Sequence, residues 1–523
     1  MTLRRDLVLR EIATTKEWDV LVIGGGATGL GTALEAASRG YRTLIVEKYD
    51  FAKGTSSRSS KLAHGGVRYL KQLKLALVLD ALRERGYMRK NAPHLVHRLA
   101  FVVPAYSYSS LPYYGFGLKT YERLAGKLSF GKSIILSKEE TVTRLPTIAQ
   151  QHLKGGVLYF DGQFDDARYA IALMRTLEDT HGCAINYMEA IGLLHRAGRT
   201  LGVRVRDRES GVETEILAKS VINATGVFVE EILQMDKLPE ERLLAISQGT
   251  HFVLPRSYLP GDHALLIPKT ADGRVLFAIP WHEHVVIGTT DDLVPETTAE
   301  PRSMERERNF LAAHIRRFLG KEINSDDVSS MWSGLRPLIR NGNRNSSKLS
   351  RDHKIFVSAT GLITVTGGKW TTYRRMGQDA VDQAARTAGL AAAPSRTASL
   401  PLHGWAAEET LASFGESEWA YGSDLPALQS LSNQDATLNT LLHPRLPYRK
   451  GEVVWAARHE MARTVEDVLA RRTRALFLDA HAAMDSAPEA ARLLAAELGR
   501  GNEWVEQEIQ TFRNLAAGYI YQG

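Results

Sequence analysis

The chain has 523 residues, 44% apolar and 24% charged, an ordinary composition for a folded protein with room for two or three domains. Its single cysteine, Cys183, excludes an internal disulfide and a cysteine metal cluster, so we expect no metal site, and redox chemistry would need a bound cofactor. The +7 formal charge is concentrated in residues 61–132, where 13 Lys and Arg stand against three acidic residues.

A nucleotide-binding unit is predicted near the start of the chain. The apolar strand 19–23 runs into Gly24, Gly26 and Gly29, which have the G-x-G-x-x-G spacing. In this motif the first glycine permits a tight turn, the second lets the backbone approach a pyrophosphate, and the third lets the following helix pack closely. The amides at the start of that helix attract phosphate. The pattern indicates dinucleotide binding.

The next segment favours FAD over NAD as the dinucleotide. A second strand, 43–46, ends at Glu47, at the distance where an acid bonds a ribose hydroxyl. A nicotinamide enzyme usually continues its sheet, whereas this chain enters the polar loop 55–62. Such a loop suits phosphate and flavin edges, although it is also compatible with a solvated turn.

The basic block 61–132 contains two uncharged aromatic segments, 101–106 and 111–116. Basic residues around amphipathic aromatics favour the surface of an anionic bilayer, and the alternative is a solvated basic face over core aromatics. Nucleic acid is disfavoured because no known binding motif accompanies the block. We expect no signal peptide after residues 3–6 and no transmembrane helix, so membrane contact would be peripheral.

Further along the chain, strands are predicted at 156–160 and 219–223, the second followed by Gly226, where a second glycine turn can approach the dinucleotide. Segments 275–280 and 285–288 instead predict an antiparallel hairpin. These hairpin strands indicate that a second sheet interrupts the nucleotide domain.

A return strand at 355–359 leads to Gly367 and Gly368, which precede a predicted helix whose positive end favours an electron-rich ring. Beyond residue 395 apolar residues recur every three or four positions, and residues 486–489 are expected to open a helix that Gly499 closes. The last part of the chain is therefore predicted to be helical.

The predicted fold class is α/β: a Rossmann-like domain for FAD, interrupted by an antiparallel-sheet substrate domain and followed by an all-α C-terminal domain. The expected ranges are 17–92, 156–245 and 345–395 for the FAD-binding domain, 93–155 and 246–344 for the substrate or cap domain, and 396–523 for the helical domain.

One loop carries a motif that is specific enough to suggest a protein family. Residues 59–70 read S-S-K-L-x-H-G-G-x-R-Y-L, and together with the glycine motif they resemble the FAD-dependent glycerol-3-phosphate dehydrogenases, respiratory enzymes that pass electrons to quinone. Further segments that match the family, in its order, are 223–226, 279–281, 287–291, 333–337, 350–352 and 367–374.

The resemblance implies oxidation of sn-glycerol 3-phosphate to dihydroxyacetone phosphate, with quinone as the final acceptor. It also implies peripheral attachment at the cytoplasmic face of a membrane, with a homodimer as one option for the assembly. The residues expected to bind FAD are Gly24, Gly26, Gly29, Glu47, Thr55, Ser59, Ser60, Lys61, Leu62, His64, Gly226, Gly367, Gly368, Lys369, Trp370 and Thr371.

The substrate phosphate needs cations. Arg68, Arg336 and Arg351 all fall inside family motifs and can offer charge-assisted, bidentate hydrogen bonds, and Tyr69 can add a hydroxyl donor. Each arginine alone would more often be a surface ion-pair residue.

Alcohol oxidation also needs a base and a hydride acceptor held close together. His251 and His64 are the candidate bases, with His251 preferred, and packing against FAD is the alternative role for each. Lys369 is expected to stabilise negative charge on reduced flavin or on the developing alkoxide, and Arg336 completes the catalytic set.

Three rival functions are compatible with these motifs. A soluble glycerol-3-phosphate oxidase would pass electrons to oxygen, and a FAD-dependent amino-acid oxidase would need an arginine for carboxylate but not three cations for phosphate. A non-catalytic flavoprotein could bind lipid or a partner at a membrane.

Overall fold

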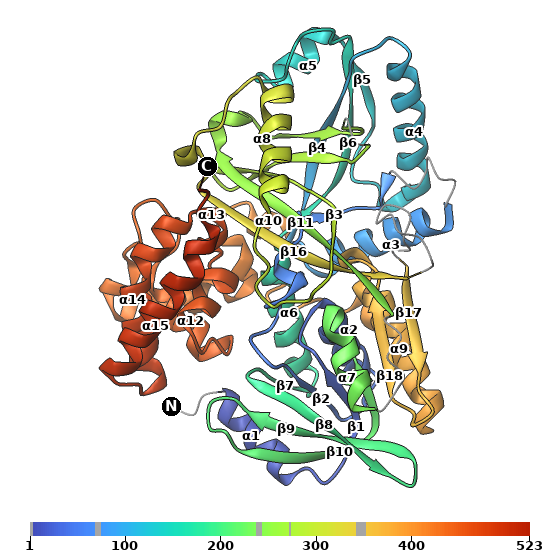
Figure 1. Cartoon of the computed structure of the whole chain (residues 1–523), viewed down its shortest axis with the longest axis vertical. Helices are drawn as coiled ribbons and strands as arrows, with labels where there is room; N and C mark the ends of the chain where they lie inside the picture. Colours follow the sequence, from blue (N-terminus) through green and yellow to red (C-terminus); the bar gives the residue numbers. More distant parts are fainter. Residues whose placement is uncertain (1–3, 68–74, 237–242, 271–272, 341–351, 523) are drawn as a thin grey trace.

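The computed structural model describes residues 4–67, 75–236, 243–270, 273–340 and 352–522. Figure 1 shows one sheet at the bottom of the molecule, a second sheet above it, and the C-terminal helices packed along one side of both.

The lower sheet is the predicted nucleotide-binding sheet, and its strand order is β17-β18-β10-β1-β2-β7. At its centre β1 pairs in parallel with β2 and β10, and its residues are almost entirely buried, as expected for a strand covered on both faces. The strands are β1 Trp18–Ile23, β2 Thr43–Val46, β7 Cys183–Ile185, β8 Met188–Arg196, β9 Arg199–Asp207, β10 Glu213–Asn223, β17 His353–Val357 and β18 Ile363–Gly367. The helices of this part are α1 Arg4–Thr14, α2 Ala27–Ser38, α6 Asp166–Asp179, α7 Val229–Met235 and α9 Tyr373–Ala388.

The upper sheet has the order β15-β11-β14-β13-β12-β4-β6-β3, with β16 added at β11 and β5 at β6. Its strands are β3 Leu62–Ala63, β4 Val96–Ala105, β5 Ile134–Leu136, β6 Gly155–Phe164, β11 Leu244–Pro255, β12 His263–Ile267, β13 Leu276–Trp281, β14 His284–Gly288, β15 Asp292–Val294 and β16 Ser330–Ile339. The helices around it are α3 Leu75–Asn91, α4 Ser110–Ala125, α5 Lys138–Arg144 and α8 Glu305–Leu319. The predicted hairpin is confirmed as β13 and β14.

Two predicted strands are placed differently. The range 156–245 assigned β6 to the nucleotide domain, but β6 pairs antiparallel with β4 along its whole length and belongs to the upper sheet. The strand that leads into Gly367 is β18, which pairs in parallel with β10, whereas the expected strand 355–359 overlaps β17 at the edge. The first error comes from pairing between distant segments, which a local pattern does not contain. The second is local, because β17 and β18 form a short antiparallel hairpin whose second strand was not predicted.

The C-terminal part is helical, as predicted: α10 Glu408–Leu411, α11 Leu425–Gln434, α12 Lys450–His459, α13 Ala475–Leu478, α14 Ala480–Leu498 and α15 Asn502–Ala516, with a π-helical segment at Asp467–Arg472. The helix expected to open at 486–489 begins earlier, at Ala480, because Asp479 caps it by accepting the N–H of Ala482. Gly499 ends it in a left-handed conformation, as predicted.

Buried ion pairs join the helical part to the nucleotide sheet. The carboxylate of Asp50, just after β2, accepts hydrogen bonds from Arg471 (2.5 Å) and Arg472 (2.5 and 2.9 Å), and all three side chains are buried. Burial alone would raise the pKa of Asp50, but the two guanidinium groups hold it below its ordinary value. Arg168 of α6 pairs with Glu460 in the same way, at 2.7 and 2.8 Å.

We expect Asp50→Ala to lower the free energy of unfolding by about 3–5 kcal/mol, because it leaves Arg471 and Arg472 buried beside too little negative charge. Urea titration followed by tryptophan fluorescence measures the change. Asp262→Ala, which removes a fully exposed partner of Arg256, is the control and should cost less than about 1 kcal/mol. Equal losses in the two variants would contradict a role for the Asp50 cluster.

Candidate active site

A cavity of about 1780 Å³ lies between the two sheets, well above the roughly 300–1,000 Å³ of an ordinary small-ligand pocket. At one end it is lined by the turn after β1 and by Glu47. At the other end it is lined by β11 and β16 of the upper sheet. Such a volume and such an elongated lining suit a dinucleotide with a small substrate beside it.

The glycine motif has the roles that its spacing predicts. Gly24 has φ +106°, and a Cβ there would lie 2.8 Å from the carbonyl oxygen of Ala224. A Cβ at Gly29 would overlap the carbonyl oxygen of Gly24, so Gly29 serves helix packing and does not line the cavity. Gly26 lines the cavity, and a Cβ there would meet only the hydroxyl of Ser56, at 3.0 Å. The missing side chain of Gly26 therefore leaves room for a ligand at the start of α2.

Glu47 lies at the edge of the cavity with its carboxylate fixed by the backbone. It accepts the N–H groups of Gly25 (2.5 Å) and Tyr49 (2.8 Å). Burial raises the pKa of Glu47, an effect that these two hydrogen bonds reduce. The remaining oxygen lone pairs can accept a ribose hydroxyl.

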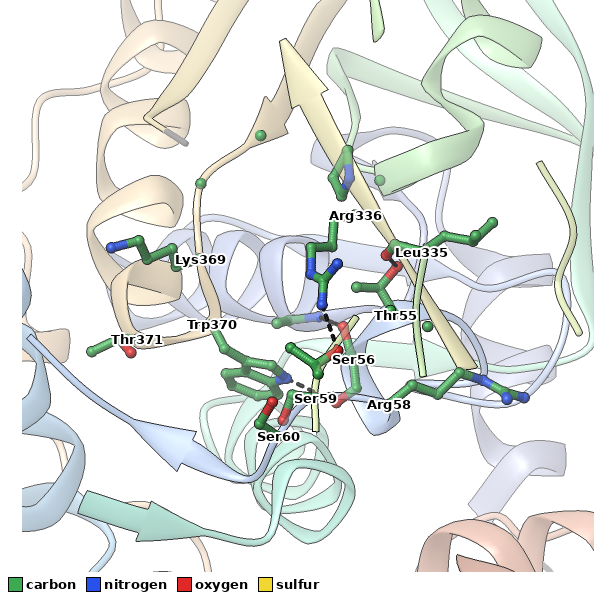
Figure 2. A pocket seen from close by; sticks show the side chains of 18 of the residues that line it. Thr55, Ser56, Arg58, Ser59, Ser60, Leu335, Arg336, Lys369, Trp370 and Thr371 are labelled. Carbon is green, nitrogen blue, oxygen red and sulfur yellow. Dashed lines mark hydrogen bonds between the residues drawn. The ribbon is translucent and has the colours of Figure 1, made fainter. Parts of the chain in front are cut away.

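The polar loop after β2 is held on several sides. Thr55 donates to the carbonyl of Leu335 (2.7 Å), Ser56 accepts the N–H of Ala27 (2.9 Å), and Trp370 donates its indole N–H to the carbonyl of Ser56 (2.8 Å). Figure 2 shows the Trp370 ring facing this loop. Thr55, Ser59, Ser60 and Leu62, which are expected to bind FAD, line the cavity.

Lys61 differs from the prediction. It is fully buried and does not line the cavity, because its ammonium donates to Asp166 Oδ2 and to the carbonyl of Ser57, both at 2.8 Å. Burial lowers the pKa of Lys61, and Asp166 acts in the opposite direction. The expected side-chain contact of Lys61 with the cofactor is therefore corrected to a buried ion pair.

His251 and Arg336 lie on paired strands that form one wall of the cavity. In the β11–β16 register His251 faces Trp332, Gly249 faces Gly334, and Ser247 faces Arg336. The space that a side chain would fill at each glycine is taken by a neighbour, Arg336 and Thr289 at Gly249 and Arg58 at Gly334.

The guanidinium of Arg336 reaches back over Gly249, because a Cβ at Gly249 would overlap its Nη2. It donates to Thr289 Oγ1 (2.9 Å) and the carbonyl of Thr290 (3.2 Å), and lies 3.4 Å from Asp291 Oδ1. Gly249 is two residues from His251, so guanidinium and imidazole are separated by about 7 Å along the strand.

His251 is buried, and its Nε2 lies 2.8 Å from the hydroxyl of Ser60. Burial, with the nearby cations of Lys61 and Arg336, lowers the pKa of His251 well below its ordinary value. The imidazole is therefore neutral at physiological pH and can accept a proton.

The segment after β18 forms another part of the wall. Gly367 and Gly368 have φ of +80° and +73°, and Lys369 and Thr371 line the cavity beside them. The hydroxyl of Thr371 accepts the N–H of His64 at 3.3 Å, which brings the second candidate histidine to the same cavity. Gly226, which is also expected to bind FAD, lines the same cavity.

Three predicted substrate ligands, Arg68, Tyr69 and Arg351, lie outside the described residues. Five further cations line the cavity and were not predicted as site residues: Lys48, Lys53, Arg58, Lys269 and Arg274. Lys269 and Arg274 lie between β12 and β13, outside the hairpin segments 275–280 and 285–288 that the sequence pattern indicated. Within the described part of the chain, no group of three His, Cys, Asp or Glu side chains could hold a metal ion.

Comparisons with known proteins agree with this geometry. The FAD dependent oxidoreductase family matches residues 19–374, and the C-terminal domain of alpha-glycerophosphate oxidase matches residues 395–506. The chain is 38% identical to mitochondrial glycerol-3-phosphate dehydrogenase of Rattus norvegicus, over 99% of this chain and 75% of that one. A probable mitochondrial glycerol-3-phosphate dehydrogenase of Caenorhabditis elegans is 39% identical, over 98% of this chain and 75% of the relative.

The chain belongs to the FAD-dependent glycerol-3-phosphate dehydrogenases. The solved structure of the glycerol-3-phosphate dehydrogenase from Bacillus halodurans complexed with FAD matches it with a TM-score of 0.81 and 28% identity, over 99% of each chain. The predicted family, α/β fold class and FAD cofactor are thereby confirmed.

The residues of the cavity fit FAD. The start of α2 beside Gly26 can hold the pyrophosphate, and Glu47 can hold the ribose. The loop 55–62 and the segment 367–371 are left for the flavin end, next to His251 and Arg336.

We expect Gly26→Val to fold normally but to bind FAD at least about tenfold more weakly, a loss of about 1.4 kcal/mol, because the new side chain occupies the approach of the pyrophosphate. Flavin absorbance of the purified protein and FAD titration of the apoprotein measure the effect. Gly192→Val on β8 is the matched control. A Cβ at Gly192 would have its nearest contact at 4.0 Å, with the Cβ of Arg204, so it would not clash. FAD affinity equal to that of the control would show that Gly26 does not face the cofactor.

Proposed function

We propose that the protein oxidises sn-glycerol 3-phosphate to dihydroxyacetone phosphate at FAD and passes the electrons to a quinone in the membrane. The observation that carries the first part is the position of His251 and Arg336 on the paired strands β11 and β16, where both line the cavity. It places a neutral base and a fixed cation on one wall of the cofactor cavity, about 7 Å apart along the strand. This spacing is on the scale of a three-carbon alcohol with a phosphate at one end.

Arg336 binds the phosphate in this proposal. Thr289, Thr290 and Asp291 hold the guanidinium in place before substrate enters, so little side-chain entropy is lost on binding. Charge-assisted hydrogen bonds to phosphate then fix one end of the substrate and orient its secondary hydroxyl. Lys269 adds a cation to the lining of the same cavity, whereas the guanidinium of Arg274, which also lines it, is paired with Asp292 at 3.1 Å.

His251 takes the proton from that hydroxyl. Its low pKa keeps the imidazole unprotonated, and the hydroxyl of Ser60 fixes its ring orientation through Nε2. Lys369 stabilises negative charge that develops on the cavity side of the segment after β18. FAD, when bound, supplies the hydride acceptor.

Arg336→Ala should lower kcat/KM for sn-glycerol 3-phosphate by about 100-fold, since a hydrogen bond to a charged group contributes about 1.5–3 kcal/mol. FAD content should stay unchanged, and Arg336→Lys should recover part of the loss. The measurement is bleaching of the flavin when substrate is added without oxygen. Arg306→Ala, an exposed arginine of α8, is the control. Wild-type flavin that stays oxidised with this substrate, but bleaches with an amino acid, would contradict the proposed reaction.

The quinone proposal is supported by aromatic residues in the cavity lining. They are Phe101 and Phe277 on the upper sheet and Tyr113, Tyr114 and Phe116 on α4. An apolar acceptor fits these side chains better than it fits the guanidinium of Arg336.

We also propose peripheral contact with the cytoplasmic face of a membrane, and the exposed side chains of helix α4 support the contact with a membrane. The side chains of Tyr113 and Phe116 are 56% and 76% exposed, and Ile134 and Ile135 of the adjoining β5 are about half exposed. Lys119, Arg123 and Lys127 follow on or just after the same helix and are exposed. Exposed aromatics with basic neighbours favour an anionic lipid surface. None of the described helices is both long enough and apolar enough to cross a bilayer.

We expect Phe116→Glu to weaken binding of the holoenzyme to phosphatidylglycerol vesicles. The new carboxylate is repelled by the anionic lipid, and the variant lacks the exposed aromatic ring that would insert into the lipid surface. Reduction of a long-chain quinone in those vesicles should fall more than reduction of a soluble dye. Val212→Glu, at an exposed apolar position (59%) between β9 and β10, is the matched control. Equal vesicle binding by the two variants would remove α4 from the membrane surface, and rapid peroxide formation with poor quinone reduction would favour an oxidase.

A further inference from the structure

A closed aromatic cluster lies behind His251 and extends to the C-terminal domain. The rings of His251 and Trp332 stack across the β11–β16 pair, with centroids 5.1 Å apart and planes at 16°. Phe477 of α13 meets Trp332 edge to face at 5.0 Å. Both aromatic side chains are almost fully buried, so the position of the His251 ring depends on a residue more than 200 positions later in the chain.

Lys61 inserts its ammonium into this cluster. Its Nζ lies 5.2 Å from the ring centroid of Trp332, 5.3 Å from Phe477 and 5.6 Å from Trp281. A buried ammonium is costly unless it is paired, and here Asp166 pairs with it while the three ring faces surround it.

The ion pair is fastened to the C-terminal domain as well. Arg474, the residue that precedes α13, donates hydrogen bonds to Asp166 Oδ1 (3.1 Å) and to the carbonyl of Ser57 (2.9 Å). Lys61 and Arg474 both have left-handed backbones, with φ of +60° and +63°. This conformation costs a non-glycine residue about 1–2 kcal/mol, so tertiary contacts hold both residues in place.

We propose that Lys61 is a positioning residue for His251. In this proposal Arg474 and Phe477 of the C-terminal domain hold Lys61 in place, and Lys61 in turn fixes the imidazole of His251. The proposal rests on His251 being the base of the proposed function. Lys61 reaches His251 by two routes: its chain neighbour Ser60 contacts Nε2, and its ammonium lies against the Trp332 ring on which the imidazole stacks. Neither route needs Lys61 to touch the cofactor or the substrate.

The charge of Lys61 adds a second effect. Lys61 and Arg336 are the cations that act on the buried imidazole, while Asp166, Asp165 and Arg474 face Lys61 itself. Removing the Lys61 charge removes one cause of the low His251 pKa. The pKa of His251 should then rise, so the base becomes protonated at a higher pH.

Lys61→Met tests this, because the side chain keeps its length and loses its charge, while Asp166 keeps its contacts with Arg474 and Ser59. In the holoenzyme we expect kcat to fall at least about tenfold, with KM for sn-glycerol 3-phosphate and FAD content within about twofold. The acid limb of the kcat/KM profile should move to higher pH. Lys450→Met, which breaks an ion pair with Glu489 inside the C-terminal domain, is the matched control and should change none of these.

A second pair of variants covers the case that Lys61→Met does not fold. Trp332→Phe keeps a ring under His251 and should retain most of kcat, whereas Trp332→Leu should lose it with little change in KM. An unchanged kcat and pH profile in Lys61→Met, or equal kcat in the two Trp332 variants, would overturn the proposal and leave the proposed function intact.

Failure of the proposed function has a different signature, since the wild-type flavin would then not bleach with substrate. The pKa of His251, measured by NMR on histidine-labelled holoenzyme, still tests the link in that case. Equal values in wild type and Lys61→Met would overturn the influence of Lys61 on His251.

Discussion

Ion pairs that are largely shielded from solvent hold the segment between β2 and β3 in place, and this segment supplies part of the active-site lining. Asp50 is paired with Arg471 and Arg472, Lys53 with Glu466 and Glu300, and Arg58 with Glu300. The cavity side of the same segment carries the hydroxyls of Thr55, Ser59 and Ser60. Loss of one partner in such a cluster leaves an uncompensated buried charge, so removal of a single side chain is expected to destabilise the whole segment. The C-terminal domain, which supplies Arg471, Arg472 and Glu466, is thus a support of the cofactor loop.

This dependence explains which parts of the structure could be predicted. The turn from Gly24 to Gly29 has a local pattern, and its spacing between a strand and a helix, with Glu47 after the next strand, was enough to predict dinucleotide binding. The choice of FAD needed the loop 55–62 and the family resemblance. The β13–β14 hairpin is equally local. By contrast, the partner of β6 is β4, which is some sixty residues earlier, and no period in the sequence of β6 contains that information.

Lys61 shows the same limit at the level of one side chain. It stands between Ser60 and Leu62, which both line the cavity, and its sequence context is that of a phosphate ligand. Its direction is set by Asp166 on α6 and by three rings from β13, β16 and α13. Only the tertiary structure brings these elements together. The position of the Arg336 guanidinium is likewise a product of strand register, since it lies over Gly249, which is 85 residues from Gly334 in the chain yet opposite it in the sheet.

The two ends of the cavity differ in chemistry, and this difference is consistent with two reactants that share one cofactor. At the β11–β16 wall a guanidinium is held by Thr289 and Asp291, which suits an anion that arrives from water. Toward α4 the lining becomes aromatic and continues into side chains that are exposed on the surface. An anion would lose hydration without compensation among the aromatic residues, and an apolar molecule would displace water from the guanidinium without replacing its hydrogen bonds. The difference in polarity between the two ends of the cavity can therefore keep the proposed substrate and the proposed acceptor apart without a conformational change. Each reactant is disfavoured at the end that suits the other.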